Sequence, residues 1–207
     1  MLCLQGGREF TDECVEMDRV VLHRSGASTV AVLAGAARVG SDYDGASERA
    51  RRHYEQLGAT VIALPDPRSD IDGVLDALTA SIDLLVLPGG SPTSLLDVLS
   101  GHVRTRILDR YAAGMSISGA SAGAMVLCEQ MVRPDRGDVV DGLGLAPGLA
   151  LPHWSPGPTR WQVPDVHLWG LPECGGVILD GEQVWAVGHG EPAFRESGTW
   201  TRADRLR

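Results

Sequence analysis

The sequence contains no lysine and no asparagine, so all 18 of its basic side chains are arginine. A Walker-type phosphate-binding loop, a Schiff base and a Ser-Lys dyad each need a lysine, and a Cys-His-Asn triad needs an asparagine. The two absences exclude all four arrangements. Any catalytic triad in this chain must therefore be completed by Asp, Glu or Gln.

Membrane-spanning segments, a secretory signal and an excess of positive charge are also missing, and each absence excludes a class of function. No apolar run approaches the roughly 20 residues of a membrane helix, and the N-terminus lacks the basic and apolar segments of a secretory signal. We therefore expect a cytoplasmic protein. A net charge of −9 argues against binding to nucleic acid or to an anionic membrane, because both require clustered positive charge. The expected partner is a small peptide or amide substrate, and a homodimer stays open on general grounds.

Metal-ligand and disulfide patterns are also missing. The four cysteines form no Cys-x-x-Cys pair and are too few for a disulfide scaffold in 207 residues, so we expect free thiols. No His-x-His or His-x-x-x-His pair offers ligands at a standard spacing. We expect no metal and no cofactor.

The first two thirds of the chain alternate between short β-branched runs and amphipathic stretches. This pattern predicts an α/β fold, a three-layer sandwich with a mostly parallel central sheet. The expected strands cover residues 29–33, 60–64, 83–87 and 115–118, and the expected helices cover 44–57, 70–80, 92–99, 103–113 and 122–130. The length suits a single domain over residues 1–207.

The composition changes after about Arg133. Glycine and proline become frequent there, and all five tryptophans lie in this last third, which predicts loops and short strands. Residues 177–179 and 183–187 flank the turn sequence Asp180-Gly181, a pattern typical of a C-terminal β-hairpin.

Ser121 is the candidate nucleophile. It lies in the run Gly119-Ala120-Ser121-Ala122-Gly123, between an expected strand and an expected helix. A serine on such a sharp turn, a nucleophile elbow, needs small neighbours because the backbone is strained and the hydroxyl must project from the sheet edge. The five residues alone also fit a tight junction or an anion-binding turn. The complete strand, elbow and helix favour a nucleophile.

Two backbone amides are candidates for an oxyanion hole. The amide of Ala122 opens the helix that follows the elbow, where unpaired N–H groups can hold a negative charge. Gly90 ends a bare-backbone turn after a strand that is expected to lie beside the elbow strand.

In the absence of lysine, we expect the general base to be one of the six histidines. His23 and His53 fall in expected surface helices, and His102 follows a helix end, so structural roles are favoured for these three. His153 ends a short apolar segment where the chain would leave the sheet near its catalytic edge, and it is the first candidate. His167 and His189 are the alternatives.

Five segments, in order along the chain, carry a resemblance to a known family. They are Leu87-Pro88-Gly89-Gly90-Ser91-Pro92-Thr93, the elbow from Gly119 to Ala124, the stretch from Gly142 to Pro147, Pro152-His153-Trp154, and Gly170-Leu171-Pro172-Glu173. In them the chain resembles the serine peptidases that include aspartyl dipeptidase (peptidase E) and cyanophycinase. The resemblance implies a sheet related to the class I glutamine amidotransferases. It also implies a triad in which Ser121 is the nucleophile, His153 the base and Glu173 the residue that orients the imidazole.

The resemblance also bears on substrate choice. In the aspartyl dipeptidases a Glu-Thr-Arg motif after the histidine is associated with the acidic side chain of the substrate, and here the sequence reads Pro158-Thr159-Arg160. Thr159 and Arg160 are therefore candidate substrate-binding residues, the arginine as a bidentate carboxylate clamp, although the glutamate is replaced by proline. Asp135 lies near an aspartate that follows the elbow in these enzymes, but an aspartate in Arg-Pro-Asp-Arg also fits an ordinary turn.

The sequence thus predicts a serine hydrolase that cleaves small peptides such as aspartyl dipeptides. The start of the chain, Leu4 to Phe10, looks more like the cyanophycinase branch, which hydrolyses β-aspartyl-arginine units. Two alternatives stay open: an ester or amide hydrolase of the same fold, and a catalytically silent binding protein that kept the elbow.

Overall fold

A computed structural model describes residues 1–157, 163 and 165–203. Its centre is a sheet of seven strands in the order β11-β10-β1-β5-β4-β2-β3. These strands are β1 (Leu2–Gln5), β2 (Thr29–Val32), β3 (Thr60–Ala63), β4 (Leu84–Leu87), β5 (Ser116–Ala120), β10 (Gly175–Asp180) and β11 (Gln183–Gly188). The five strands from β1 to β3 in that order are parallel, and β10 and β11 are antiparallel additions at one edge. The predicted α/β class with a mostly parallel sheet is confirmed.

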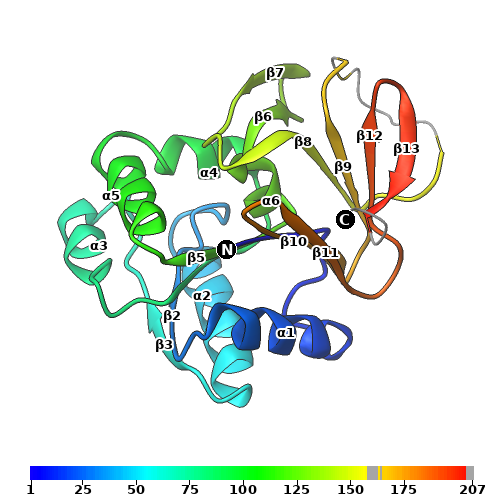
Figure 1. Ribbon diagram of the computed structural model, residues 1–207. Helices are drawn as coiled ribbons and strands as arrows, with labels where there is room; N and C mark the ends of the chain where they lie inside the picture. Colours follow the sequence, from blue (N-terminus) through cyan, green and yellow to red (C-terminus); the bar gives the residue numbers. More distant parts are fainter. Residues whose placement is uncertain (158–162, 164, 204–207) are drawn as a thin grey trace.

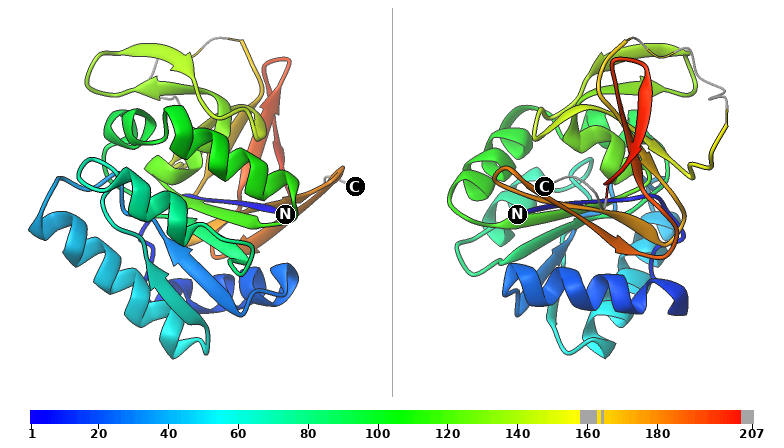
Figure 2. Two further views of the ribbon diagram at one scale, coloured as in Figure 1. Left: turned by 90° about the vertical axis from the view of Figure 1, so that its left-hand side faces the viewer. Right: turned by 45° about the vertical axis from the view of Figure 1, so that its right-hand side comes forward.

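Helices cover both faces of this sheet (Figure 2), as the three-layer prediction requires. On one face lie α1 (Val15–Ser25), after a short 3₁₀ turn η1 (Asp12–Cys14), and α2 (Ser41–Gln56). On the other face lie α4 (Pro92–Val98), α5 (Gly101–Ala112) and α6 (Ala122–Leu127), and α3 (Ile71–Ala77) packs against α5. Among the described residues, every helix is too short or too polar to cross a membrane.

A second sheet of six strands, in the order β13-β12-β9-β8-β6-β7, lies beside the first (Figure 1). Its strands are β6 (Cys128–Arg133), β7 (Asp138–Asp141), β8 (Ala146–Pro152), β9 (Leu168–Leu171), β12 (Ala193–Glu196) and β13 (Thr199–Arg202). Helix α6 packs against β5 of the first sheet and against β6 and β8 of the second. The helix predicted over 122–130 therefore ends at Leu127, because Cys128 onward pairs with β8 and β7 rather than continuing the helix.

The predicted C-terminal hairpin is confirmed. Strands β10 and β11 pair antiparallel with Asp180 opposite Gln183, and Gly181 in the turn has a φ of 58°. A second hairpin, formed by β12 and β13, was not predicted. The short strands expected after Arg133 are present: β10 and β11 join the first sheet, and β7, β8, β9, β12 and β13 join β6 in the second.

The sequence predicted a surface position for His53, and that prediction is wrong. Its side chain is 6% exposed, and its Nε2 lies 2.8 Å from the Oδ2 of Asp18, which is fully buried. Gln5 and Tyr54 also donate to the Asp18 carboxylate. A buried carboxylate needs polar partners, so this face of α2 turns inward.

Candidate active site

The elbow at Ser121 joins buried strand β5 to helix α6. Ser121 has φ 49° and ψ −105°, a backbone conformation that costs a non-glycine residue on the order of 1–3 kcal/mol. The Ser121 amide donates to the carbonyl of Gln5 on the adjacent strand β1, at 2.9 Å. A Cβ on Gly123 would overlap the Leu87 carbonyl, and one on Gly119 would overlap Gly123. Glycine at these two positions lets the helix pack directly against the sheet and holds the strained turn.

His153 is placed against the serine by the end of strand β8. Its Nε2 lies 3.0 Å from Ser121 Oγ, within hydrogen-bonding distance. The His153 backbone has a φ of 54°, and its amide donates to the carbonyl of Gly6 at 2.9 Å. A Cβ on Gly7 would overlap the imidazole Cε1. The glycine pair after β1 therefore forms the wall against which the ring rests.

Glu173 stands on the far side of the imidazole. It follows β9, and its Oε1 lies 3.3 Å from His153 Nδ1. The next residue, Cys174, has a φ of 51° and donates its amide to the carbonyl of Gly7. Arg8 Nε is 3.8 Å from Glu173 Oε2. The side chains of His153 and Glu173 are each 48% exposed, so this pair lies in an open cleft.

Gly90 and Ala122 lie beside Ser121, as expected for the two oxyanion candidates. Gly90 lines the same cavity as Ser121 and His153, and its φ is 142°. A Cβ on Gly90 would come within 2.5 Å of the carbonyl of Ala36, so only glycine fits there. Ala122 is the fully buried first residue of α6.

Glu9 also belongs to the site, although no sequence pattern predicted it. Its Oε1 accepts a hydrogen bond from the Gly89 amide at 2.7 Å. A Cβ built on Gly89 would lie 2.8 Å from that oxygen and 3.2 Å from Ser121 Cβ, so Glu9 and Ser121 flank the same glycine. The available signal was topological: β1 runs parallel to β5, so the residues after both strands meet at one sheet edge.

The remaining candidates are placed less closely. Asp135 is exposed and accepts a hydrogen bond from Thr93 Oγ1 at 2.5 Å, which lowers the pKa of its carboxyl group. Its neighbour Pro134 lines the cavity beside Ser121, and Asp135 itself is not among the lining residues. Thr159 and Arg160 lie outside the described residues.

The two alternative histidines are not at the elbow. His167 stacks on Phe194 with ring centroids 5.4 Å apart, and burial lowers its pKa. His189 follows β11 and donates its amide to the Cys174 carbonyl. In the part of the chain that the structure describes, no group of three or more His, Cys, Asp or Glu side chains is placed to hold a metal ion.

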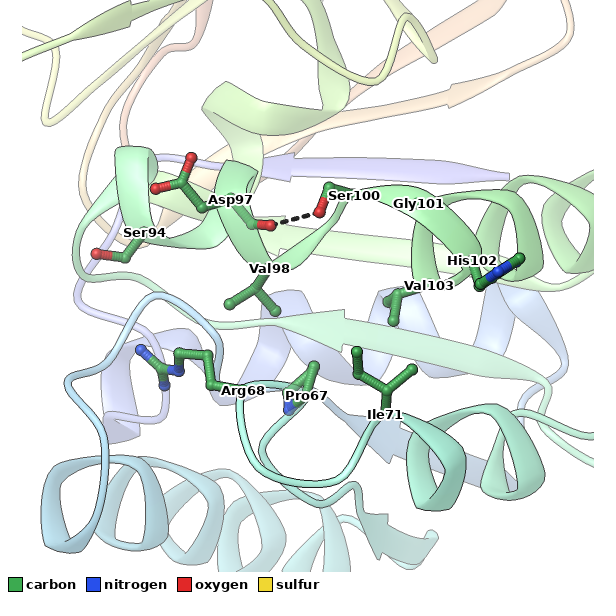
Figure 3. Close-up of a pocket in the computed structure, with 10 residues that line it drawn as sticks. All are labelled: Pro67, Arg68, Ile71, Ser94, Asp97, Val98, Ser100, Gly101, His102 and Val103. Atoms are coloured by element: carbon green, nitrogen blue, oxygen red, sulfur yellow. Dashed lines mark hydrogen bonds between the residues drawn. The ribbon is translucent and has the colours of Figure 1, made fainter.

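A cavity of about 190 Å³ opens beside Ser121. Its lining is Gly90, Pro92, Ser121, Met125, Val132, Pro134, Ala150, Leu151, Pro152 and His153. A larger hollow of about 490 Å³ lies elsewhere, between α3, α4 and α5, where Val98 and Val103 point toward Pro67 and Ile71 (Figure 3). The larger hollow contains none of the candidate catalytic residues.

A serine on a strand-to-helix elbow, with a histidine and a carboxylate beside it at the edge of a parallel sheet, is an arrangement that serine hydrolases use. The sequence comparison makes this specific: the chain belongs to peptidase family S51, whose profile matches residues 4–191.

Two solved structures share the fold. One, a peptidase from an acI-B1 Actinobacterium, superimposes with a TM-score of 0.76 at 21% identity over 97% of this chain and 96% of that one. The other, a putative peptidase E protein from Listeria monocytogenes EGD-e, gives a TM-score of 0.69 at 18% identity over 91% and 98%. No curated protein matches the sequence. The resemblance to the peptidase E family is confirmed, and the two structural likenesses show the fold alone.

Proposed function

We propose that this chain is a serine peptidase that hydrolyses small peptides through an acyl-enzyme on Ser121, with His153 and Glu173 completing the triad. The observation that carries the proposal is the continuous series of contacts from Ser121 Oγ to His153 Nε2, 3.0 Å, and from His153 Nδ1 to Glu173 Oε1, 3.3 Å. Membership of a peptidase family supports the reaction class.

The geometry supports general-base activation of the serine. The Ser121 hydroxyl donates to Nε2 when Nδ1 carries the other proton, and a carboxylate at Nδ1 favours that tautomer. As Oγ attacks a substrate carbonyl, its proton moves to Nε2. The Glu173 carboxylate then stabilises the imidazolium, which passes the proton to the leaving amine. Water hydrolyses the acyl-enzyme by the same route in reverse.

The amides of Gly90 and Ala122 are assigned as the hydrogen-bond donors that stabilise the negative charge on the attacked oxygen. Donors of this kind, fixed before the reaction, are each worth roughly 10²- to 10³-fold in kcat. Glycine at position 90 supports the assignment, because a side chain there would collide with Ala36 and move the turn away from the serine.

Aspartyl dipeptides are the specific substrates that the sequence resemblance suggests. That suggestion rests on Arg160 and Thr159, which are outside the described residues. The cyanophycinase-like alternative, cleavage of β-aspartyl-arginine units, rests on Leu4 to Phe10, and Glu9 in that stretch lies beside the nucleophile.

The first experiment is hydrolysis of Asp-Leu, Leu-Leu, β-Asp-Arg and p-nitrophenyl acetate by the wild type and by Ser121→Ala. A fluorophosphonate probe reports in parallel whether Ser121 is activated. Ser81→Ala is the matched control, because Ser81 is exposed at the opposite end of β4 from the Gly89 turn. We expect peptide cleavage and probe labelling that Ser121→Ala abolishes and Ser81→Ala retains.

Other outcomes separate the alternatives. Ester turnover without peptide cleavage would indicate a non-peptide hydrolase with the same triad. If the probe does not label the wild type, the chain is a binding protein without catalytic activity. Labelling that survives in Ser121→Ala would remove this serine from the mechanism.

A further inference from the structure

The cavity beside Ser121 differs in chemistry from a site for an acidic side chain. Among its described lining residues, the polar side chains are those of Ser121 and His153, which already belong to the triad. The others are apolar side chains and the bare backbone of Gly90. No described arginine lines it.

The walls come from rigid, buried parts of the fold. Met125 is on α6, one turn beyond the nucleophile, and is 6% exposed. Val132 on β6 is 2% exposed, and Ala150 and Leu151 on β8 are 0% and 5% exposed. These side chains are fixed by packing in the main core cluster, so the cavity is preformed.

Two carboxylates adjoin residues that line the cavity. Asp135 adjoins the lining residue Pro134, and Glu9 adjoins Ser121 across Gly89. A carboxylate entering the cavity would lose its hydration, and none of the described lining side chains is a cation that could compensate for that loss. An apolar side chain would have no such desolvation cost on entering the cavity.

The volume limits what can enter. At about 190 Å³ the cavity is smaller than the roughly 300–1,000 Å³ of pockets that enclose a whole drug-sized ligand. It suits one aliphatic side chain. Because Gly90 and Ser121 both border it, a substituent on the carbon next to the attacked carbonyl would lie in it while the carbonyl oxygen faces the Gly90 turn.

We propose that this cavity is the subsite for the residue that acylates Ser121, and that it selects a small aliphatic side chain over an aspartyl one. The proposal rests on the proposed peptidase function and names its substrate class: short peptides with an N-terminal residue such as leucine or valine.

The test compares Leu-Ala, Asn-Ala and Asp-Ala, whose first side chains are close in shape and differ in polarity and charge. We expect kcat/KM for Leu-Ala to exceed that for Asp-Ala about hundredfold, with Asn-Ala between them. Met125→Ala removes one wall and should lower kcat/KM for Leu-Ala roughly tenfold with little effect on Asp-Ala. Met115→Ala is the matched control: Met115 is 2% exposed, lies before β5 and does not line the cavity. It should leave the Leu-Ala to Asp-Ala ratio unchanged.

A second measurement separates this proposal from the peptidase function. Ser121→Ala cannot form an acyl-enzyme, so calorimetric titration with the same dipeptides reports binding alone. Binding of Leu-Ala at least tenfold tighter than Asp-Ala, lost with Met125→Ala in the same background, supports the subsite even if the wild type cleaves none of the three. Equal or tighter binding of Asp-Ala, or a preference for Asp-Ala in turnover, overturns it.

Discussion

The carboxylate of Glu9 accepts a hydrogen bond from the amide of Gly89, and this bond joins the loop after β1 to the turn after β4 on the two sides of β5. Gly89 precedes Gly90, whose amide is assigned to the oxyanion hole. The bond therefore fixes the position of a glycine turn that has no side chain of its own to anchor it.

Glu9→Ala should lower kcat by roughly tenfold and change KM less, because a looser turn weakens charge stabilisation in the transition state more than ground-state binding. Glu9→Gln keeps an oxygen acceptor and should recover most of the loss. The measurement is steady-state kinetics on the best substrate of the panel. An equal loss in both variants would instead assign the effect to the charge of Glu9.

Glu173 is expected to act through His153. Glu173→Gln removes the charge that stabilises the imidazolium and should lower kcat by roughly 10²- to 10⁴-fold with the fold intact. Glu182→Gln, at an exposed position in the β10–β11 turn, is the matched control and should leave kcat unchanged. Circular dichroism spectra that superimpose for the three proteins would exclude unfolding. A Glu173→Gln variant with wild-type kcat would contradict the triad.

Gly7 is expected to be as sensitive as a catalytic residue, although it takes no part in the chemistry. A Cβ there would overlap the His153 ring, and its φ is 127°. Gly7→Ala should displace the imidazole and lower kcat about 10²-fold, the order of loss expected for a 1 Å misplacement. Gly58→Ala is the control for backbone strain: its φ is 92°, and a Cβ would meet nothing within 4 Å. It should cost roughly 1 kcal/mol of stability and no activity.

The parts of the fold that sequence predicted best were those with simple periodicity. The buried strands β2 and β4 are continuous apolar runs, and α4 begins with Ser91 as N-cap and Pro92 in its first turn. The second sheet was harder to predict, because β8 contains glycine and two prolines and β9 contains glycine, residues that strands usually lack. Strand β8 also packs against α6, a tertiary contact that the sequence does not reveal.

The site was predictable to different degrees. Ser121 follows from local pattern, since the elbow needs small neighbours that the sequence displays. His153 follows from its place at the end of a strand. Glu173 is set beside the imidazole by the left-handed backbone of Cys174 and its bond to Gly7, which no sequence pattern announces. Only the family resemblance identified it. Glu9 was missed because its role depends on a contact with Gly89, 80 residues away.

The four thiols should be unreactive in the folded protein. All are buried, and burial raises the pKa of Cys3, Cys14 and Cys128 to about 12. At pH 8 the thiolate, which is the nucleophile, is therefore scarce. Ellman's reagent should titrate only a minor fraction of the thiols in the native state and all four in guanidinium. Cys14 Sγ lies 2.9 Å from Cys174 Sγ, so two thiols missing after unfolding, with a mass lower by two hydrogens, would reveal a disulfide there and contradict the prediction.

Asp83 should make stability depend on pH. Its Oδ2 accepts hydrogen bonds from the Ser28 amide, the Ser28 hydroxyl and the Thr29 amide, and the backbone bonds are the main cause of its lowered pKa. Because the folded pKa lies below the unfolded one, the stabilisation is complete above the unfolded pKa and is lost as pH falls through the folded value.

Asp83→Asn should therefore lower the free energy of unfolding by about 1 kcal/mol at pH 7 and by less at pH 3, because pH 3 lies below the ordinary aspartate pKa of about 3.9 in the unfolded chain and part of the stabilisation is already lost there. Urea unfolding at the two pH values measures the difference. Asp76→Asn makes the same charge change at an exposed position on α3 and should give equal, small effects at both. An ionised carboxylate accepts these hydrogen bonds more strongly than an amide oxygen does. If Asp83→Asn loses the same free energy of unfolding at pH 7 and at pH 3, the charge is not the cause, and the effect belongs to the shape of the side chain.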